Sequence, residues 1–373
     1  MPTGGAMPVA LSDQDREAFL AALEERRTQV YDYLDAWPGS AHFRPPEIYD
    51  AIYSYIRRRG KALRPLVLLL SCAAVGGDEE QALPAAAAVE VFHTWTLVHD
   101  DIIDRDDTRR GRPTVHAEFA AHAARTYGLD LEQAAHYGRA VAILAGDSQQ
   151  SWAYALLGSL VKRGVSPVLV VRLIDRMATW LTPELLAGEM LDVQYSLTPP
   201  EELSENQVLN MLTRKTGALL EYAAWCGATI GLGGKPDPHD VAGRLGNFAT
   251  LCGTAFQLRD DILGLTADEA RLGKPVGSDL REGKRTLIVH AALANGSERE
   301  RQKILAVLGN PTATRADIDQ ALLAIHETGA LVRVEESANL LISQAHAILA
   351  GVPDTPHRKL LTSWASFLLA RQY

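Results

Sequence analysis

Five aspartates lie within eight positions of the stretch "LVHDDIIDRDDTRRGRPTVH", residues 97–116, and arginines are interspersed among them. Asp100 and Asp104 are four residues apart, so on a helix they share one face, with β-carbons about 6 Å apart. Two ionised carboxylates this close repel each other, and a multivalent cation would remove that cost. Because the ligands are all oxygen atoms, the pair favours Mg²⁺ over zinc. Taken alone, the stretch could instead be an acidic helix end facing water.

A second acidic pair strengthens the metal interpretation. "FQLRDDILGL" contains Asp260 and Asp261, again where a long apolar run ends. Two such helix ends facing one cavity would form a multi-metal site open to phosphate oxygens. Asp101 is turned about 100° from Asp100 on a helix, so we expect it to support the ligands rather than bind the metal.

Basic residues follow both acidic pairs and occur in two further motifs. Arginine suits bidentate contacts to phosphate, and lysine supplies a point charge. Each of these residues alone is ordinary for a solvated surface, but beside the carboxylates they indicate that diphosphates bind together with metal ions. They are Lys61 and Arg64 in "RGKALRP", Arg109 and Arg110 after the first pair, Lys215 (with Thr216) in "RKTGALL", and Lys274 and Lys284 in "GKPVGSDLREGKRT".

The elements that must position these residues are helices. Apolar residues recur at helical spacing and alternation typical of strands is scarce, so the sequence predicts an all-α fold. Several helices are apolar nearly all round, which places them at the centre of a large bundle. No linker divides the chain, so we expect one domain over residues 13–373 after a disordered segment, residues 1–12. The longer helices are expected near residues 15–37, 46–59, 83–104, 134–162, 167–195, 205–232 and 238–265.

Composition narrows the function classes. The 373 residues carry a net charge of −9, which argues against a general nucleic-acid surface. Cys72, Cys226 and Cys252 are too scattered for a disulfide framework or a zinc site, which is typical of a reducing cytosol. We find no signal peptide and no apolar run long enough for a transmembrane segment, so a cytoplasmic location is expected.

Taken together, the motifs resemble those of the trans-isoprenyl diphosphate synthases, or polyprenyl synthetases, and most of all the geranylgeranyl diphosphate synthase type. The resemblance covers roughly residues 45–370. "DDIID" is similar to the first Asp-rich motif of the family and "FQLRDDILG" to the second. "GKALRP", "DDTRRGRPTVH", "GEMLDV", "RKTG" and "GKPVGSDLREGKRT" stand in the order of the family.

This resemblance implies a homodimer of antiparallel helix bundles, each around a deep cavity (the isoprenoid synthase fold), with both Asp motifs at the cavity mouth. It implies three Mg²⁺ ions held by Asp100, Asp104 and Asp260, with Asp101, Asp261 and Asp279 in support. It also implies that the allylic diphosphate is held by Arg109, Lys215, Lys274 and Lys284. Isopentenyl diphosphate would be held by Lys61, Arg64, His93 and Arg110. The oxygens of Thr216 and Gln257 would stabilise the allylic cation.

The implied reaction is ionisation of the allylic diphosphate, condensation with isopentenyl diphosphate and loss of a proton to the departing diphosphate. Two departures from the family pattern stand out. Arg59 and Ala62 occupy positions where the first basic motif usually has Gly and Arg, and Gly264 stands where many members have a third Asp. The first of these would weaken isopentenyl diphosphate binding.

Three other functions are compatible with parts of this pattern. A class I terpene cyclase would share the first motif, but its second metal motif normally carries Asn, Ser or Thr, and Glu. A non-catalytic subunit of a heteromeric synthase would tend to lose acidic residues that this chain keeps. A metal phosphohydrolase built on His99 and Asp100 would need further metal-binding histidines.

Product length is expected to depend on residues before Asp100. In the family, the growing chain extends along this helix, so Trp95, about 7.5 Å from Asp100 along the axis, would form the floor of the tunnel. Thr96, one position nearer the metals, is small. This predicts geranylgeranyl diphosphate, with farnesyl diphosphate next because Trp is bulky. The alternative is that Trp95 simply packs in the core.

Overall fold

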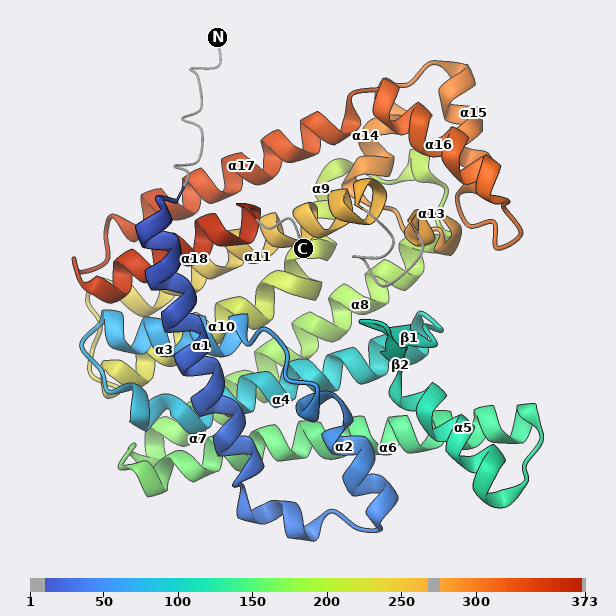
Figure 1. Ribbon diagram of the computed structural model, residues 1–373. Helices are drawn as coiled ribbons and strands as arrows, with labels where there is room; N and C mark the ends of the chain where they lie inside the picture. The colour runs from blue at the N-terminus through green and yellow to red at the C-terminus, as the bar shows by residue number, and fades with distance from the viewer. Residues whose placement is uncertain (1–10, 268–275, 371–373) are drawn as a thin grey trace. The chain divides into compact units, whose positions relative to one another are not determined.

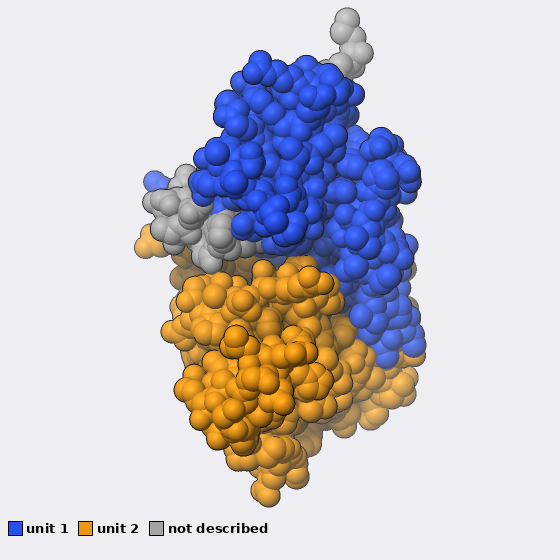
Figure 2. Space-filling model, turned by 90° about the vertical axis from the view of Figure 1, so that its right-hand side faces the viewer, with its two compact units in different colours: residues 1–16, 176–222, 243–373 blue, residues 17–175, 223–242 orange. Residues whose placement is uncertain are grey.

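The computed structural model describes residues 11–267 and 276–370, which are almost entirely helical (Figure 1). The all-α prediction is confirmed. The chain divides into two compact units, coloured in Figure 2. Unit 2 contains residues 17–175 and 223–242, and unit 1 contains residues 1–16, 176–222 and 243–373. A single domain over residues 13–373 stays a prediction, and residues 1–10 of the expected disordered segment lie outside the described residues.

Unit 2 holds the first acidic motif and the first basic motif. Its helices α4, α5 and α6 pack on one another, and α3 packs on α4. Its elements are α1 (Asp13–Asp35, from Glu17 on), α2 (Pro46–Arg57), α3 (Leu63–Ala74), α4 (Glu79–Ile103), β1 (Thr108–Arg109), β2 (Arg112–Pro113), α5 (Val115–Tyr127), α6 (Leu131–Gly158), α7 (Pro167–Arg176, as far as Asp175) and the part of α10 (Ala218–Gly231) that begins at Ala223, with short 3₁₀ helices at Pro38–His42 and Ser159–Arg163.

The centre of unit 2 is α4. Its N-cap is Asp78, whose side chain accepts a hydrogen bond from the Glu80 N–H. From Ala82 to Phe92 every side chain of α4 is buried, on all faces of the helix. A helix apolar nearly all round can only be stable inside a core, as the sequence predicts. This helix delivers the first acidic motif to the surface of the unit.

Unit 1 holds the second acidic motif. In it α14 packs on α17, α17 on α18, and α15 on α16. Its elements are α8 (Thr182–Leu197), α9 (Glu205–Leu212), the part of α10 (Ala218–Gly231) that ends at Tyr222, α11 (Val241–Thr266, from Gly243 on), α13 (Ser278–Glu282), α14 (Leu287–Asn295), α15 (Glu298–Val307), α16 (Arg315–Glu327), α17 (Ala330–Leu349) and α18 (Pro356–Ala370), with a 3₁₀ helix at Pro200–Glu202.

Two of the expected long helices contain a π-helical turn. The segment expected as one helix over 167–195 has such a turn at Met177–Leu181, and the segment over 205–232 has one at Thr213–Gly217. Apolar spacing does not reveal a π turn, because one extra residue shifts the pattern by less than the width of an apolar face. Such turns occur often at functional sites, and the second contains Lys215 and Thr216.

Among the described residues, no helix combines the length and the apolarity needed to cross a bilayer.

A close helix crossing in unit 2 generates the first testable prediction. A β-carbon at Gly227 would overlap the carbonyl oxygen of Leu68 and lie 2.8 Å from its carbonyl carbon. Because both obstacles are backbone, Gly227→Ala should separate α10 from α3 and destabilise the fold by about 1–3 kcal/mol. The free energy of unfolding, measured by denaturant titration, tests this.

The matched control is Gly158→Ala. At the end of α6, a β-carbon at Gly158 has no neighbour within 4 Å, and the backbone there is right-handed helical. This variant should be as stable as the parent or slightly more so, since Ala favours a helix over Gly. Equal stability of Gly227→Ala and the parent would contradict the close packing.

Candidate functional site

The first acidic motif lies at the C-terminal end of α4. Asp104 is the C-cap residue, and its N–H donates to the Asp100 carbonyl at 2.8 Å. The helical backbone therefore continues through both residues and places them on one face, as the spacing predicts. Both side chains are partly exposed, whereas Asp101 is buried.

Asp101 is held by two side chains from other elements. Arg109 Nε donates to Asp101 Oδ1 at 2.7 Å, and the Tyr55 hydroxyl donates to Asp101 Oδ2. Arg109 Nη2 also reaches Asp100 at 3.4 Å. Burial raises the pKa of Asp101, and the bonds from Arg109 and Tyr55 oppose that rise. Asp101 thus fixes Arg109 beside the metal-ligand candidates, an arrangement consistent with its expected supporting role.

Arg109 and Arg110 lie in a short hairpin. Strand β1 pairs antiparallel with β2, and the residues between them are Arg110 and Gly111, with φ of 53° and 72°. Positive φ at both central positions is the geometry of a type I′ turn, which suits the twist of a hairpin. The hairpin holds Arg109 against Asp101 and leaves Arg110 exposed.

The first basic motif runs from the link after α2 into the first turn of α3, so Lys61 lies in the link and Arg64 in the helix. Arg64 Nη1 donates to His93 Nε2 at 3.0 Å, so the structure brings these two predicted residues together. Burial lowers the pKa of His93 well below its ordinary value, and the charges of Arg64 and Arg110 lower it further. The imidazole is therefore neutral and accepts this bond. Lys61 is exposed.

The two departures in this motif fall at special backbone positions. Arg59 and Ala62 both have positive φ, 45° and 51°. Glycine adopts this region freely, whereas other residues pay a steric cost. A glycine at position 59 would suit this conformation, and Arg59 holds it at that cost.

Trp95 and Thr96 lie on the buried part of α4. Trp95 is buried, with its ring against Phe92 at 4.7 Å and His99 at 5.9 Å between centroids. The Thr96 hydroxyl donates to the His93 carbonyl at 2.7 Å and is half-buried. Whether Trp95 limits product length stays a prediction.

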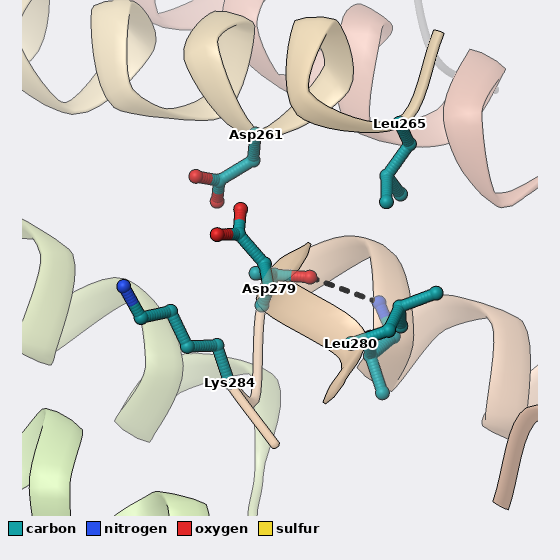
Figure 3. Close-up of a pocket in the computed structure, with 7 residues that line it drawn as sticks. Asp261, Leu265, Asp279, Leu280 and Lys284 are labelled. Atoms are coloured by element: carbon teal, nitrogen blue, oxygen red, sulfur yellow. Dashed lines mark hydrogen bonds between the residues drawn. The ribbon is translucent and has the colours of Figure 1, made fainter. Parts of the chain in front are cut away.

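The second acidic motif, in unit 1, lies in the last two turns of α11. Figure 3 shows the carboxyl groups of Asp261 and Asp279 pointing toward each other. They line a small pocket with Lys284, whose backbone N–H donates to the Asp279 carbonyl at 2.9 Å. The other lining residues are Leu265, Leu280, Thr286 and Val289.

The surroundings of Asp261 strongly perturb its carboxyl group. Its pKa is raised to about 8, chiefly by burial and also by the negative charges of Asp279, Asp260 and Asp192, while a bond from Gln257 opposes the rise. Gln257 Nε2 donates to Asp261 Oδ1 at 2.9 Å. No hydrogen bond from the described residues reaches the buried Asp261 Oδ2.

Thr216 and Gln257 are also brought together. The Thr216 hydroxyl donates to Gln257 Oε1 at 3.1 Å, which fixes the amide so that its nitrogen faces Asp261. Thr216, Gln257 and Asp261 therefore form a hydrogen-bonded row that joins the π turn to α11.

Lys215 is held by two acids that sequence reasoning missed. Its Nζ lies 2.8 Å from Glu189 Oε2 and 2.7 Å from Asp192 Oδ2. These acids are three residues apart on α8 and so share a face. Their spacing of three residues within "GEMLDV" could have predicted that both acids face the same partner. Tyr55 was missed too, and it carried no signal because its partner is distant in the sequence.

Gly188 makes this arrangement possible. A β-carbon there would overlap the backbone nitrogen of Lys215 and lie 2.8 Å from its α-carbon. Only glycine lets α8 approach the π turn this closely.

The remaining basic candidates are Lys274 and Lys284. Lys284 Nζ lies 3.2 Å from Glu282 in unit 1. Lys274 lies outside the described residues. Asp100 belongs to unit 2 and Asp260 to unit 1, and their facing one cavity stays a prediction.

The donor chemistry fits Mg²⁺. Within residues 11–267 and 276–370, no group of three or more His, Cys, Asp or Glu residues is close enough to hold a metal ion by itself. Mg²⁺ usually binds one or two carboxylates and takes its other ligands from water and substrate phosphates. Such a cation would stabilise the charged form of the buried Asp261 carboxyl described above.

Comparison with known proteins identifies what the chain is similar to. The sequence profile described as polyprenyl synthetase matches residues 45–325. The chain is 37% identical over 330 residues to a geranylgeranyl diphosphate synthase of Methanosarcina mazei, covering 88% of this chain and 91% of that protein. It is 40% identical over 273 residues to a geranylgeranyl diphosphate synthase of Sulfolobus acidocaldarius, covering 73% and 75% of the two proteins.

A solved structure extends this similarity to the fold. The geranylgeranyl pyrophosphate synthase of Corynebacterium glutamicum, crystallised with isoprenyl diphosphate and magnesium, superposes with a TM-score of 0.80 at 30% identity. The match covers 97% of this chain and all of that one. The predicted isoprenoid synthase fold is confirmed.

The contact at Gly188 generates a second prediction. Gly188→Ala should push the turn Thr213–Gly217 away from α8, since the neighbouring atoms are backbone and cannot rotate aside. Amide hydrogen exchange of residues 213–217, measured by mass spectrometry, should become faster. Leu186→Ala, at an exposed position of the same helix, should leave it unchanged. Equal exchange in Gly188→Ala and the parent would contradict the role given to this glycine.

Proposed function

This chain belongs to the polyprenyl synthetase family, and we propose that it is a magnesium-dependent trans-prenyltransferase that makes geranylgeranyl diphosphate. It would condense isopentenyl diphosphate with an allylic diphosphate. The observation that carries the proposal is the combination of paired carboxylates and basic residues at the end of a buried helix in each unit, on a chain that matches the family over residues 45–325.

The carboxylates would hold the metal ions. Asp100, Asp104 and Asp260 would supply oxygen ligands for three Mg²⁺ ions, which would provide Lewis acidity toward the leaving diphosphate. Asp101 fixes Arg109 and so keeps a guanidinium beside Asp100. Asp261 and Asp279 would support Asp260 in unit 1.

The basic residues would divide into two diphosphate sites. Charge-assisted contacts to phosphate are among the strongest hydrogen bonds available to a protein. His93 would orient Arg64 through the bond that it accepts. The allylic site is formed by Arg109, Lys215, Lys274 and Lys284, and the isopentenyl site by Lys61, Arg64, His93 and Arg110.

In the reaction, the bond between the allylic carbon and its diphosphate breaks, and the electron pair leaves with the diphosphate. Lysine and arginine side chains stabilise the charge that develops on it. The Thr216 and Gln257 oxygens steady the allylic cation, which the double bond of isopentenyl diphosphate attacks. The departing diphosphate then takes the proton, so no side-chain base is required.

The proposal also includes the oligomeric state, the location and the alternative product expected from the sequence. The protein would act as a cytoplasmic homodimer on small diphosphate substrates and would not bind nucleic acid. Farnesyl diphosphate is the other candidate product, favoured by the bulk and burial of Trp95.

The test is direct. The purified protein is incubated with Mg²⁺, isopentenyl diphosphate and each short allylic diphosphate, and the products are sized by chromatography against length standards. A twenty-carbon main product supports the proposal. Absence of any elongated product would overturn it.

A third prediction concerns the two acidic motifs. Asp100→Ala and Asp260→Ala should each lower turnover by roughly 10²–10³-fold, the size of effect seen when one group that stabilises transition-state charge is removed. Excess chelator should abolish turnover in the parent. Product formation per unit time at saturating substrates is the measurement.

The controls remove a carboxylate from each unit. Asp50 in unit 2 and Asp319 in unit 1 each form an exposed ion pair, so Asp50→Ala and Asp319→Ala should keep parental turnover. Near-parental activity of Asp100→Ala or Asp260→Ala would be evidence against the metal assignment.

A fourth prediction concerns product length. Trp95→Ala should open the tunnel and shift products to longer chains, and Thr96→Phe should shift them shorter. Because Trp95→Ala can cost about 3–5 kcal/mol in stability, Trp95→Phe provides a milder variant with a smaller shift in the same direction. Thr96→Ser, which keeps the small size, should change nothing. Folded and active Trp95 variants with the parental product distribution would place the floor elsewhere.

A further inference from the structure

The link between α2 and α3 adopts a strained backbone. It runs from Arg58 to Ala62 and carries Lys61. Arg59 and Ala62 both lie in the left-handed region, which is unfavourable for side chains with a β-carbon. A backbone of this kind persists only where its surroundings fix it. The surroundings of this link should therefore contain the groups that hold it.

One face of α1 provides contacts to the link. Arg27, Tyr31 and Asp35 are spaced four residues apart, so they share that face. Arg27 Nε donates to the Gly60 carbonyl at 2.8 Å, and its Nη2 reaches the Arg59 carbonyl at 3.3 Å. The Arg59 guanidinium pairs with Asp35 at 2.9 Å and lies over the Tyr31 ring, 5.7 Å from its centroid.

The Tyr31 hydroxyl is the central contact. It accepts a hydrogen bond from the Gly60 N–H and donates one to Glu90 Oε1 at 2.6 Å. Glu90 is buried, 5% exposed, on α4. A β-carbon at Gly60 would lie 3.1 Å from the Tyr31 hydroxyl and 3.2 Å from Glu90 Oε1. The backbone of the link is thus pressed against the Tyr31–Glu90 pair.

Glu90 connects this contact to the basic residues. It lies three residues before His93 on α4, so both face the first basic motif, where His93 accepts a bond from Arg64. Burial raises the pKa of Glu90, and the Tyr31 bond and the charges of Arg64 and Arg110 oppose that rise. A negative charge on Glu90 would reduce the repulsion between these guanidiniums.

We propose that α1 holds the Arg58–Ala62 link, and with it Lys61 and Arg64, in the geometry that binds the diphosphate group of isopentenyl diphosphate. Tyr31 and Arg27 are positioning residues in this arrangement, since they act through the backbone of the link. The inference rests on the proposed function and deepens its isopentenyl site.

The experiment separates the two substrates. Tyr31→Phe removes only the hydroxyl and so breaks both bonds at once. The Michaelis constant for isopentenyl diphosphate should rise about tenfold, while that for the allylic diphosphate and kcat stay within about twofold of the parent. Arg27→Ala, at the surface of α1, should raise the same constant in the same direction. If Tyr31→Phe does not fold, Arg27→Ala decides.

The matched control is Tyr33→Phe. Tyr33 lies on the same helix, and its hydroxyl shares a hydrogen bond of 3.1 Å with Ser159, away from the link. This variant should keep both Michaelis constants. Unchanged isopentenyl constants in the folded variants, or equal changes for both substrates, would overturn the inference while leaving the proposed function intact. An inactive parent would instead overturn the proposed function.

Discussion

Burying a carboxylate away from water is unfavourable unless a positive charge or a hydrogen-bond donor lies beside it. This constraint determines which partners hold most of the candidate site residues. Asp101 is held by Arg109 and Tyr55, and Glu90 by Tyr31. Asp261 differs, because burial among other acids raises its pKa to about 8 and only Gln257 bonds it within the described residues. A cation beside this buried carboxyl would stabilise its charged form, which favours a metal-dependent site at α11.

Residue types and spacing could predict candidate site residues because charged groups placed after apolar runs are unusual. The helical placement of Asp100 and Asp104 on one face agrees with their spacing, and the contact of Arg64 with His93 agrees with the grouping that the family resemblance implies. The partners that hold these groups were not foreseeable. Tyr55 and Tyr31 are ordinary amphipathic core residues in the sequence, and each bonds a residue at least 46 positions away. Sequence spacing carries information along one helix, whereas these contacts depend on how helices pack.

The helices themselves were predictable for the same reason. An apolar pattern is imposed by burial, so the long buried helix α4 appears in the sequence as a nearly continuous apolar run. The π turn at Thr213–Gly217 does not appear there, because it depends on the approach of α8 at Gly188, which is a tertiary contact. That turn carries Lys215 to the pair of acids on α8. The backbone that is hardest to predict from the sequence, this π turn, therefore carries a candidate functional side chain.

Strained backbone also occurs mainly where candidate functional side chains lie. Within the described part of the chain, five residues other than glycine have positive φ, and four of them lie in two segments that carry basic residues. Arg59 and Ala62 lie in the link between α2 and α3, and Arg105 and Arg110 lie in the segment from the end of α4 to β2. Each costs on the order of 1–3 kcal/mol and must be offset by surrounding contacts. The hairpin pairing offsets this cost at Arg110, and α1 offsets it at Arg59. Because contacts within the chain fix both segments without any ligand, their arginines and lysines would lose less conformational freedom on binding a diphosphate, which would favour the proposed small, highly charged substrates.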